Sequence, residues 1–75
     1  MWAVHESFDA SRRTLILDLV AGGTAPVRRG PPPTLLGTFP DLGEATVFIE
    51  GYLATARRGA DHVVTRVDWG KGLAC

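Results

Sequence analysis

Four residues carry the chemistry that this 75-residue chain most readily suggests. Strand parity predicts that they share one face of a sheet: His5, His62, Asp18 and Asp68. Imidazole and carboxylate groups together are typical of transition-metal sites. The spacing, however, matches neither Cys-x-x-Cys nor His-Glu-x-x-His, so we interpret the histidines as surface residues and predict no metal and no other cofactor.

Nucleophilic catalysis would rest on Ser7, Ser11 or the lone cysteine, Cys75. A catalytic nucleophile needs a base within hydrogen-bond reach and a third group that orients the base, and the sequence identifies neither. The pair Gly22-Gly23 fits neither the P-loop nor the dinucleotide-binding pattern. We therefore predict that the protein is not an enzyme.

The stretch from Phe39 to Ala45 predicts the boundary between a strand and the helix that positions the rest of the chain. Asp41 is a favoured N-cap residue, and Glu44 follows at the spacing of a capping box. Pro40 marks the end of the preceding strand because it lacks an N–H donor. We predict a helix from Leu42 to Arg58, ended by Gly59 in a left-handed conformation.

Alternating apolar and polar residues predict four strands. Their expected ranges are Trp2 to Phe8, Arg13 to Ala21, Thr34 to Phe39 and His62 to Trp69. Between them lies a long Gly- and Pro-rich loop at residues 22–33, and residues 70–75 form a loose tail. A single amphipathic helix needs a sheet to cover it, so we predict one α+β domain over residues 1–75. In it, a four-stranded, mostly antiparallel sheet in the order ββ-loop-βαβ carries one helix on one face.

The expected core combines one face of this sheet with the apolar stripe of the helix. Its predicted members are Trp2, Val4, Phe8, Leu15, Leu17, Leu19, Leu35, Phe39, Leu42, Ala45, Ile49, Tyr52, Leu53, Ala56, Val63, Val67 and Trp69, with Phe48 at the edge of the helix stripe. The opposite face of the sheet has no second helix to shield it, and it holds a partly apolar set: Ile16, Val20, Leu36, Val64 and Arg66. Such a set is typical of a partner-binding surface or of a sheet-to-sheet homodimer, although antiparallel sheets also leave similar residues partly solvated.

The outward face of the helix offers a second candidate surface for a partner. Val47, Gly51 and Ala54 are small and recur at i, i+4 and i+7, which would let another helix approach closely. Small residues on a solvated helix surface are an equally simple explanation.

The paired arginines suggest an alternative function, the binding of nucleic acid. Eight basic and eight acidic residues give a formal net charge of zero at pH 7, so no strong field draws the chain to nucleic acid or to an anionic membrane. Paired arginines at Arg12, Arg13, Arg28 and Arg29 would still contact phosphates if the hairpin turn and the long loop converged.

Cysteine usage and hydropathy favour a cytoplasmic protein. One cysteine excludes an internal disulfide and fits a reducing compartment. No stretch resembles a signal peptide, and Asp18 interrupts the longest apolar run, so we predict no membrane partner. We predict a small non-enzymatic protein–protein interaction module that forms a homodimer and serves as an accessory subunit or an inhibitor of a larger assembly, for example one encoded by a phage or mobile element. The alternative is a nucleic-acid-binding domain that uses the paired arginines.

Overall fold

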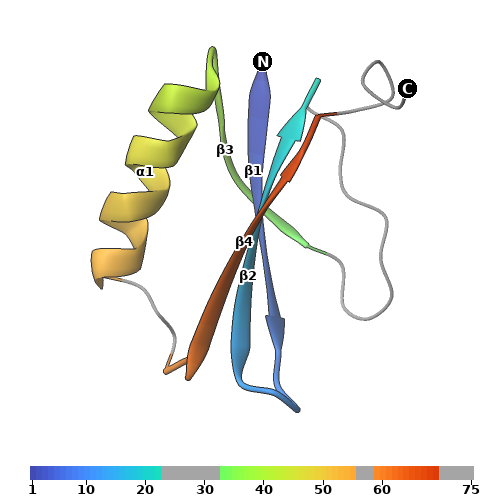
Figure 1. Cartoon of the computed structure of the whole chain (residues 1–75), viewed down its shortest axis with the longest axis vertical. Coiled ribbons are helices and arrows are strands. Elements are labelled where there is room, and N and C mark those ends of the chain that lie inside the picture. The colour runs from blue at the N-terminus through green and yellow to red at the C-terminus, as the bar shows by residue number, and fades with distance from the viewer. Residues whose placement is uncertain (23–32, 56–58, 70–75) are drawn as a thin grey trace.

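A computed structural model describes residues 1–22, 33–55 and 59–69, and Figure 1 shows its sheet with one helix beside it. The elements are β1 (Trp2–Asp9), β2 (Thr14–Ala21), β3 (Thr34–Phe39), α1 (Leu42–Thr55) and β4 (His62–Asp68). The predicted α+β class is therefore confirmed. The predicted loop at 22–33 and the tail at 70–75 lie outside the described residues, except for Gly22 and Pro33.

The sheet has the strand order β3-β1-β2-β4 and is mixed. The central strand β1 pairs antiparallel with both β2 and β3, whereas β4 pairs parallel with β2. As a result β3 and β4 run in the same direction at opposite edges of the sheet. A parallel return of this kind requires a crossover, and the chain makes it through α1 on one face.

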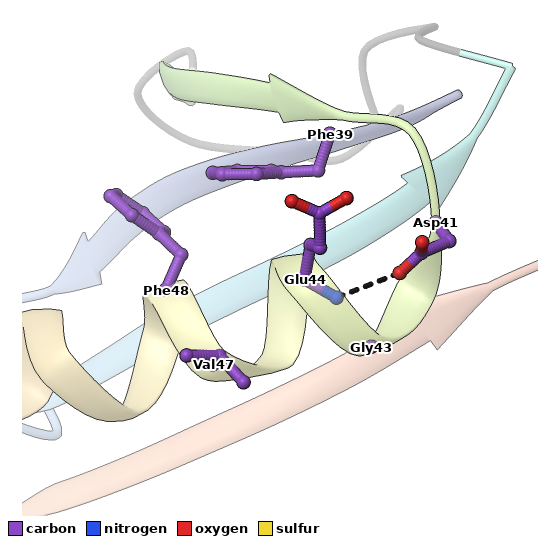
Figure 2. Close-up of a pocket in the computed structure, with 6 residues that line it drawn as sticks. All are labelled: Phe39, Asp41, Gly43, Glu44, Val47 and Phe48. Carbon is purple, nitrogen blue, oxygen red and sulfur yellow. Dashed lines mark hydrogen bonds between the residues drawn. The ribbon is translucent and has the colours of Figure 1, made fainter.

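The start of α1 follows the predicted capping. Asp41 Oδ1 accepts a hydrogen bond from the backbone N–H of Glu44 at 2.8 Å (Figure 2), so one of the free donors of the first turn is satisfied. The predicted helix is confirmed from Leu42 to Thr55, and its last three residues, 56–58, lie outside the described residues. Gly59 has a φ of 69°, the left-handed conformation expected for it.

The core lies between α1 and the face of the sheet beneath it. Its buried members are Trp2, Val4, Leu17, Leu19, Ala45 and Ile49. An aromatic ladder closes one side, with the Phe48 ring 5.0 Å from that of Phe39 and 5.8 Å from that of Tyr52. Such ring contacts add to the free energy gained by burial.

Among the described residues, Glu6 is the one carboxylate on this face of the sheet, and only 5% of its surface is exposed. The hydroxyl of Tyr52 donates a hydrogen bond to the Glu6 carboxylate, so α1 supplies a polar partner where the sequence places a charge among apolar residues. A buried carboxylate without such a partner would cost several kcal/mol.

Three predicted core residues prove to be exposed, and two of them, Val67 and Trp69, lie in or just after β4, with 44% and 52% of their surface exposed. The prediction for these two is wrong because α1 packs over β1 and β3 and leaves the β4 side of the sheet uncovered. Trp69 makes its ring contact with Trp2 instead, edge to face at 5.0 Å.

The predicted positions of Leu35 and Leu36 are exchanged. The pairing of β3 with β1 shifts register between Val4 and His5, so that Gly37 lies opposite Val4 and Leu35 lies opposite His5. Such a shift breaks the alternation of side chains between the two faces. Leu36, expected on the uncovered face, therefore packs against the core, whereas Leu35, expected in the core, is exposed.

Candidate functional site

Strand β4 lies at the edge of the sheet (Figure 1), and two of its apolar side chains, Val64 and Val67, are exposed. Every residue of β4 except Val63 is exposed. Val64 points to the face away from α1, as predicted, and is 41% exposed, while Val67 is exposed on the other face. Trp69 continues the apolar surface beyond the end of the strand. Both faces of this edge are therefore open.

A row of polar side chains crosses the face away from α1. His5, Asp18 and Arg66 lie side by side on β1, β2 and β4. Arg66 Nε donates a hydrogen bond to Asp18 Oδ1 at 3.2 Å. The Asp18 side chain is buried, whereas that of Arg66 is 48% exposed. Burial raises the pKa of the Asp18 carboxyl, and the Arg66 guanidinium opposes that rise.

Ser7 lies two residues after His5 in β1 and therefore on the same face of the sheet. Both His5 Nδ1 and Ser7 Oγ are buried and lack a hydrogen-bond partner. Ser7 Oγ therefore makes no hydrogen bond to His5, the contact that a serine nucleophile makes with its base. Within the described ranges, no three His, Cys, Asp or Glu side chains gather as metal ligands. His62 lies at the exposed start of β4, and β2 separates its strand from that of His5.

Two residues predicted on the uncovered face offer less surface than expected. Val20 is only 2% exposed and Ile16 is half-buried. Their strand, β2, is an interior strand, so side chains of β1 and β4 flank them on both sides. The expected exposure of Val20 is therefore wrong, and Val64 and Arg66 remain as the accessible residues of that set.

The outward face of α1 is exposed as predicted, at Val47, Gly51 and Ala54. A groove of about 570 Å³ adjoins it, and the sequence patterns did not indicate it. Figure 2 shows the residues that line this groove: Phe39, Asp41, Gly43, Glu44, Val47 and Phe48. Phe39 and Phe48 also belong to the aromatic ladder, so the floor of the groove is the edge of the core.

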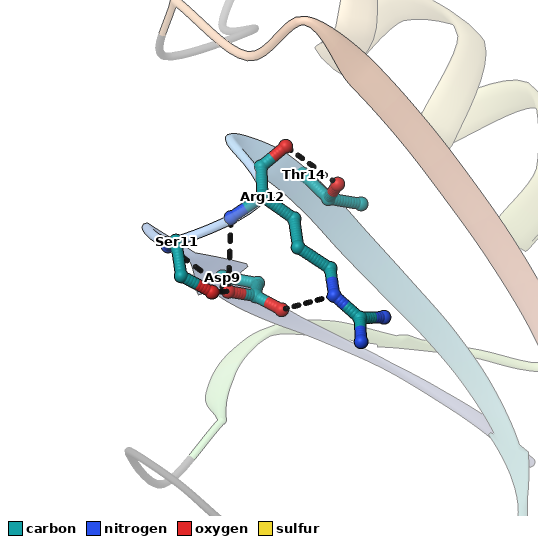
Figure 3. A network of polar contacts seen from close by, with 4 residues as sticks. All are labelled: Asp9, Ser11, Arg12 and Thr14. Atoms are coloured by element: carbon teal, nitrogen blue, oxygen red, sulfur yellow. Dashed lines mark hydrogen bonds and ion pairs between the residues drawn. The ribbon is translucent and has the colours of Figure 1, made fainter.

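The hairpin turn between β1 and β2 holds the two described arginines of the nucleic-acid hypothesis. Asp9 Oδ1 accepts hydrogen bonds from Ser11 Oγ at 2.7 Å and from the Ser11 backbone N–H at 3.1 Å (Figure 3). The Arg12 guanidinium approaches the other Asp9 oxygen at 3.9 Å, and Thr14 Oγ1 donates to the Arg12 carbonyl. The hydrogen bond from Ser11 lowers the pKa of Asp9.

Arg13 joins the turn to the segment that precedes β4. It adopts a left-handed φ of 51°, and its side chain donates to Asp61 Oδ2 and to the Gly59 carbonyl, both at 2.9 Å. Arg12 and Arg13 therefore each contact a carboxylate of the same chain. Arg28 and Arg29 lie outside the described residues, so their predicted convergence with the turn stays a prediction.

Comparison with known proteins gives no assignment. No protein-family model, no curated protein and no solved structure matches the chain. Among the described residues, no helix has the length and apolar character needed to cross a membrane.

Proposed function

We propose that this protein is a small non-enzymatic protein–protein interaction module, an accessory subunit or an inhibitor of a larger assembly, and that β4 is its contact strand. One observation carries the proposal: an edge strand that contains three valines is exposed on both faces. Full burial of a valine is worth about 1.5–3 kcal/mol, so a partner that covers Val64 and Val67 gains substantial free energy. The single cysteine fits a reducing compartment, and we place the protein in the cytoplasm.

The charged groups of β4 support a protein partner. Arg66 keeps half of its side chain accessible while Asp18 holds its guanidinium in place. A fixed, partly exposed arginine beside apolar side chains is the composition that protein interfaces favour. By contrast, the described arginines of the hairpin turn face Asp9 and Asp61, which weakens their attraction for phosphates.

A photo-crosslinking residue placed at Val67 tests the proposal in the native host. Val47 on α1 is the matched control, because it is also an exposed valine and lies on a different element. We expect the Val67 probe to form a stoichiometric protein adduct and the Val47 probe to form none. An adduct at Val47 alone would move the contact surface to the helix, and a lack of any adduct at both positions would contradict the module itself.

A further inference from the structure

The hydrogen-bonding direction of β4 determines which of its main-chain groups face outward. The His62 N–H donates to the Arg13 carbonyl, and His62 lies in register with Thr14. In a parallel pair, alternate residues direct both main-chain groups toward the same neighbour. The N–H and C=O groups of His62 and of every second residue after it therefore bond to β2. The main-chain groups that point outward belong to Val63, Thr65 and Val67.

Within the described residues, no strand covers this outward edge and neither a bulge nor a proline interrupts it. In the described part of the chain β2 is the only strand beside β4, and the β2–β4 register runs without a shift. Natural edge strands avoid pairing with other chains by means of bulges, prolines, charged side chains or short length. The opposite edge strand, β3, has a shifted register and ends directly before Pro40. β4 has seven residues in an unshifted register and contains no proline, and its charged residues are Arg66 and Asp68.

The sequence of β4 is complementary to itself when it is reversed about Thr65. An antiparallel partner in that register places Thr65 opposite Thr65 and Val63 opposite Val67. On the other face it places His62 opposite Asp68 and Val64 opposite Arg66. Cross-strand Thr–Thr pairs and apolar pairs are combinations that stabilise sheets, and a protonated imidazole opposite Asp68 would add a pair of opposite charge.

Neighbouring registers lose this complementarity. If the symmetry axis passes through Val64, His62 lies opposite Arg66 and no longer faces the carboxylate of Asp68. If the axis passes at Arg66, two arginines lie directly opposite each other, which is destabilising. The register centred on Thr65 is also the one in which all three outward residues pair with outward residues, so each exchanges both of its main-chain hydrogen bonds.

We propose that β4 pairs antiparallel with β4 of a second copy across a two-fold axis at Thr65, which joins two four-stranded sheets into one continuous sheet. The same edge serves both copies, as a closed two-fold interface requires. This inference rests on the proposed function and names its partner. It also places the predicted homodimer contact at the strand edge, in place of the sheet face or the helix groove.

Cysteine scanning tests the register under oxidising conditions, in a background that carries Cys75→Ser. A disulfide needs Cα atoms less than about 7 Å apart, and the residues of a hydrogen-bonded antiparallel pair are about 5.5 Å apart. We expect Thr65→Cys to crosslink with itself. Val63→Cys and Val67→Cys should crosslink when the two variants are mixed and not when each is alone. Self-crosslinking of Val64→Cys or Arg66→Cys, with none at Thr65→Cys, would overturn the register.

Sedimentation of the unmodified protein under reducing conditions tests the pairing itself. We expect a dimer at high micromolar concentration, and we expect Thr65→Pro to sediment as a folded monomer, because proline removes an outward N–H that makes no bond within one copy. Thr65→Val keeps the N–H and should remain dimeric. If the unmodified protein is a monomer and the Val67 photo-probe still captures another protein, the second-copy pairing is overturned while the proposed function stands.

Discussion

Two aspartates in this protein have opposite electrostatic environments. Asp18 is buried in the interior of the sheet, and burial raises its pKa above the ordinary value of 3.8, against the opposing effect of Arg66. Asp9 lies in the solvated hairpin turn, and the hydrogen bond from Ser11 lowers its pKa. The folded protein therefore favours the protonated form of Asp18 and the ionised form of Asp9, relative to the unfolded chain.

These shifts predict opposite pH dependences for Asp18→Asn and Asp9→Asn. Between pH 3.8 and its raised pKa, folded Asp18 holds a proton that the unfolded chain has released, so its contribution to the free energy of unfolding falls as pH rises. Asp9 contributes stability that is complete above 3.8 and is lost as pH falls through its lowered pKa.

Urea unfolding between about pH 2 and pH 7 measures both effects. With rising pH, Asp18→Asn should gain stability relative to the unmodified protein, and Asp9→Asn should lose it. Each variant serves as the control for the other, because both replace a carboxylate by an amide. If the free energies of unfolding of the two variants changed in the same way with pH, the environments assigned to Asp18 and Asp9 would be contradicted.

At the scale of elements, local chemistry was sufficient to predict the helix and all four strands. Asp41 fixes the start of α1 through its own side chain, and alternation identifies each strand without knowledge of its neighbours. The register of β3 was not predictable in this way. Its shift depends on pairing with β1, a contact between segments about thirty residues apart in the chain, and this shift exchanges the roles of Leu35 and Leu36.

Replacing either of two glycines, Gly51 or Gly59, by alanine tests the backbone conformation of α1 and of the residue that follows the helical segment. Gly51 lies inside α1, is exposed, and has open space where a Cβ would project. Gly51→Ala should raise the free energy of unfolding by about 0.8–1 kcal/mol, since alanine is the better helix former. Gly59 has a left-handed φ of 69°, which alanine adopts only with strain, so Gly59→Ala should lower the free energy of unfolding. Changes of the same sign, measured by urea unfolding at one protein concentration, would contradict this part of the fold.

For the whole molecule, the candidate surfaces depended on which strands the helix covers. The sequence correctly indicated that Val64 and Arg66 are accessible, because their parity within β4 places them on the face away from α1. It did not indicate that Val67 and Trp69 are accessible too, since strand order and helix position decide that. The position of α1 over β1 and β3 is a property of the assembled sheet, and it leaves β4 as the exposed edge.

Pairing through that edge links the thermal stability of the protein to its concentration. When a folded dimer unfolds to two separate chains, each tenfold rise in concentration adds about 1.4 kcal per mole of dimer to its stability. For a dimer of this size that corresponds to a rise of about 3–5 °C in the midpoint of thermal unfolding. We expect this rise for the unmodified protein in calorimetry under reducing conditions.

Thr65→Pro should unfold at the same temperature when its concentration is raised tenfold, because the stability of a monomer does not depend on protein concentration. Thr65→Val retains the outward N–H and should follow the unmodified protein, which separates the loss of pairing from the loss of the threonine side chain. The comparison also distinguishes the edge from the other surfaces of the molecule. A dimer held together by the groove beside α1 or by the sheet face would keep its concentration dependence in Thr65→Pro, and that result would exclude β4 as the dimer contact.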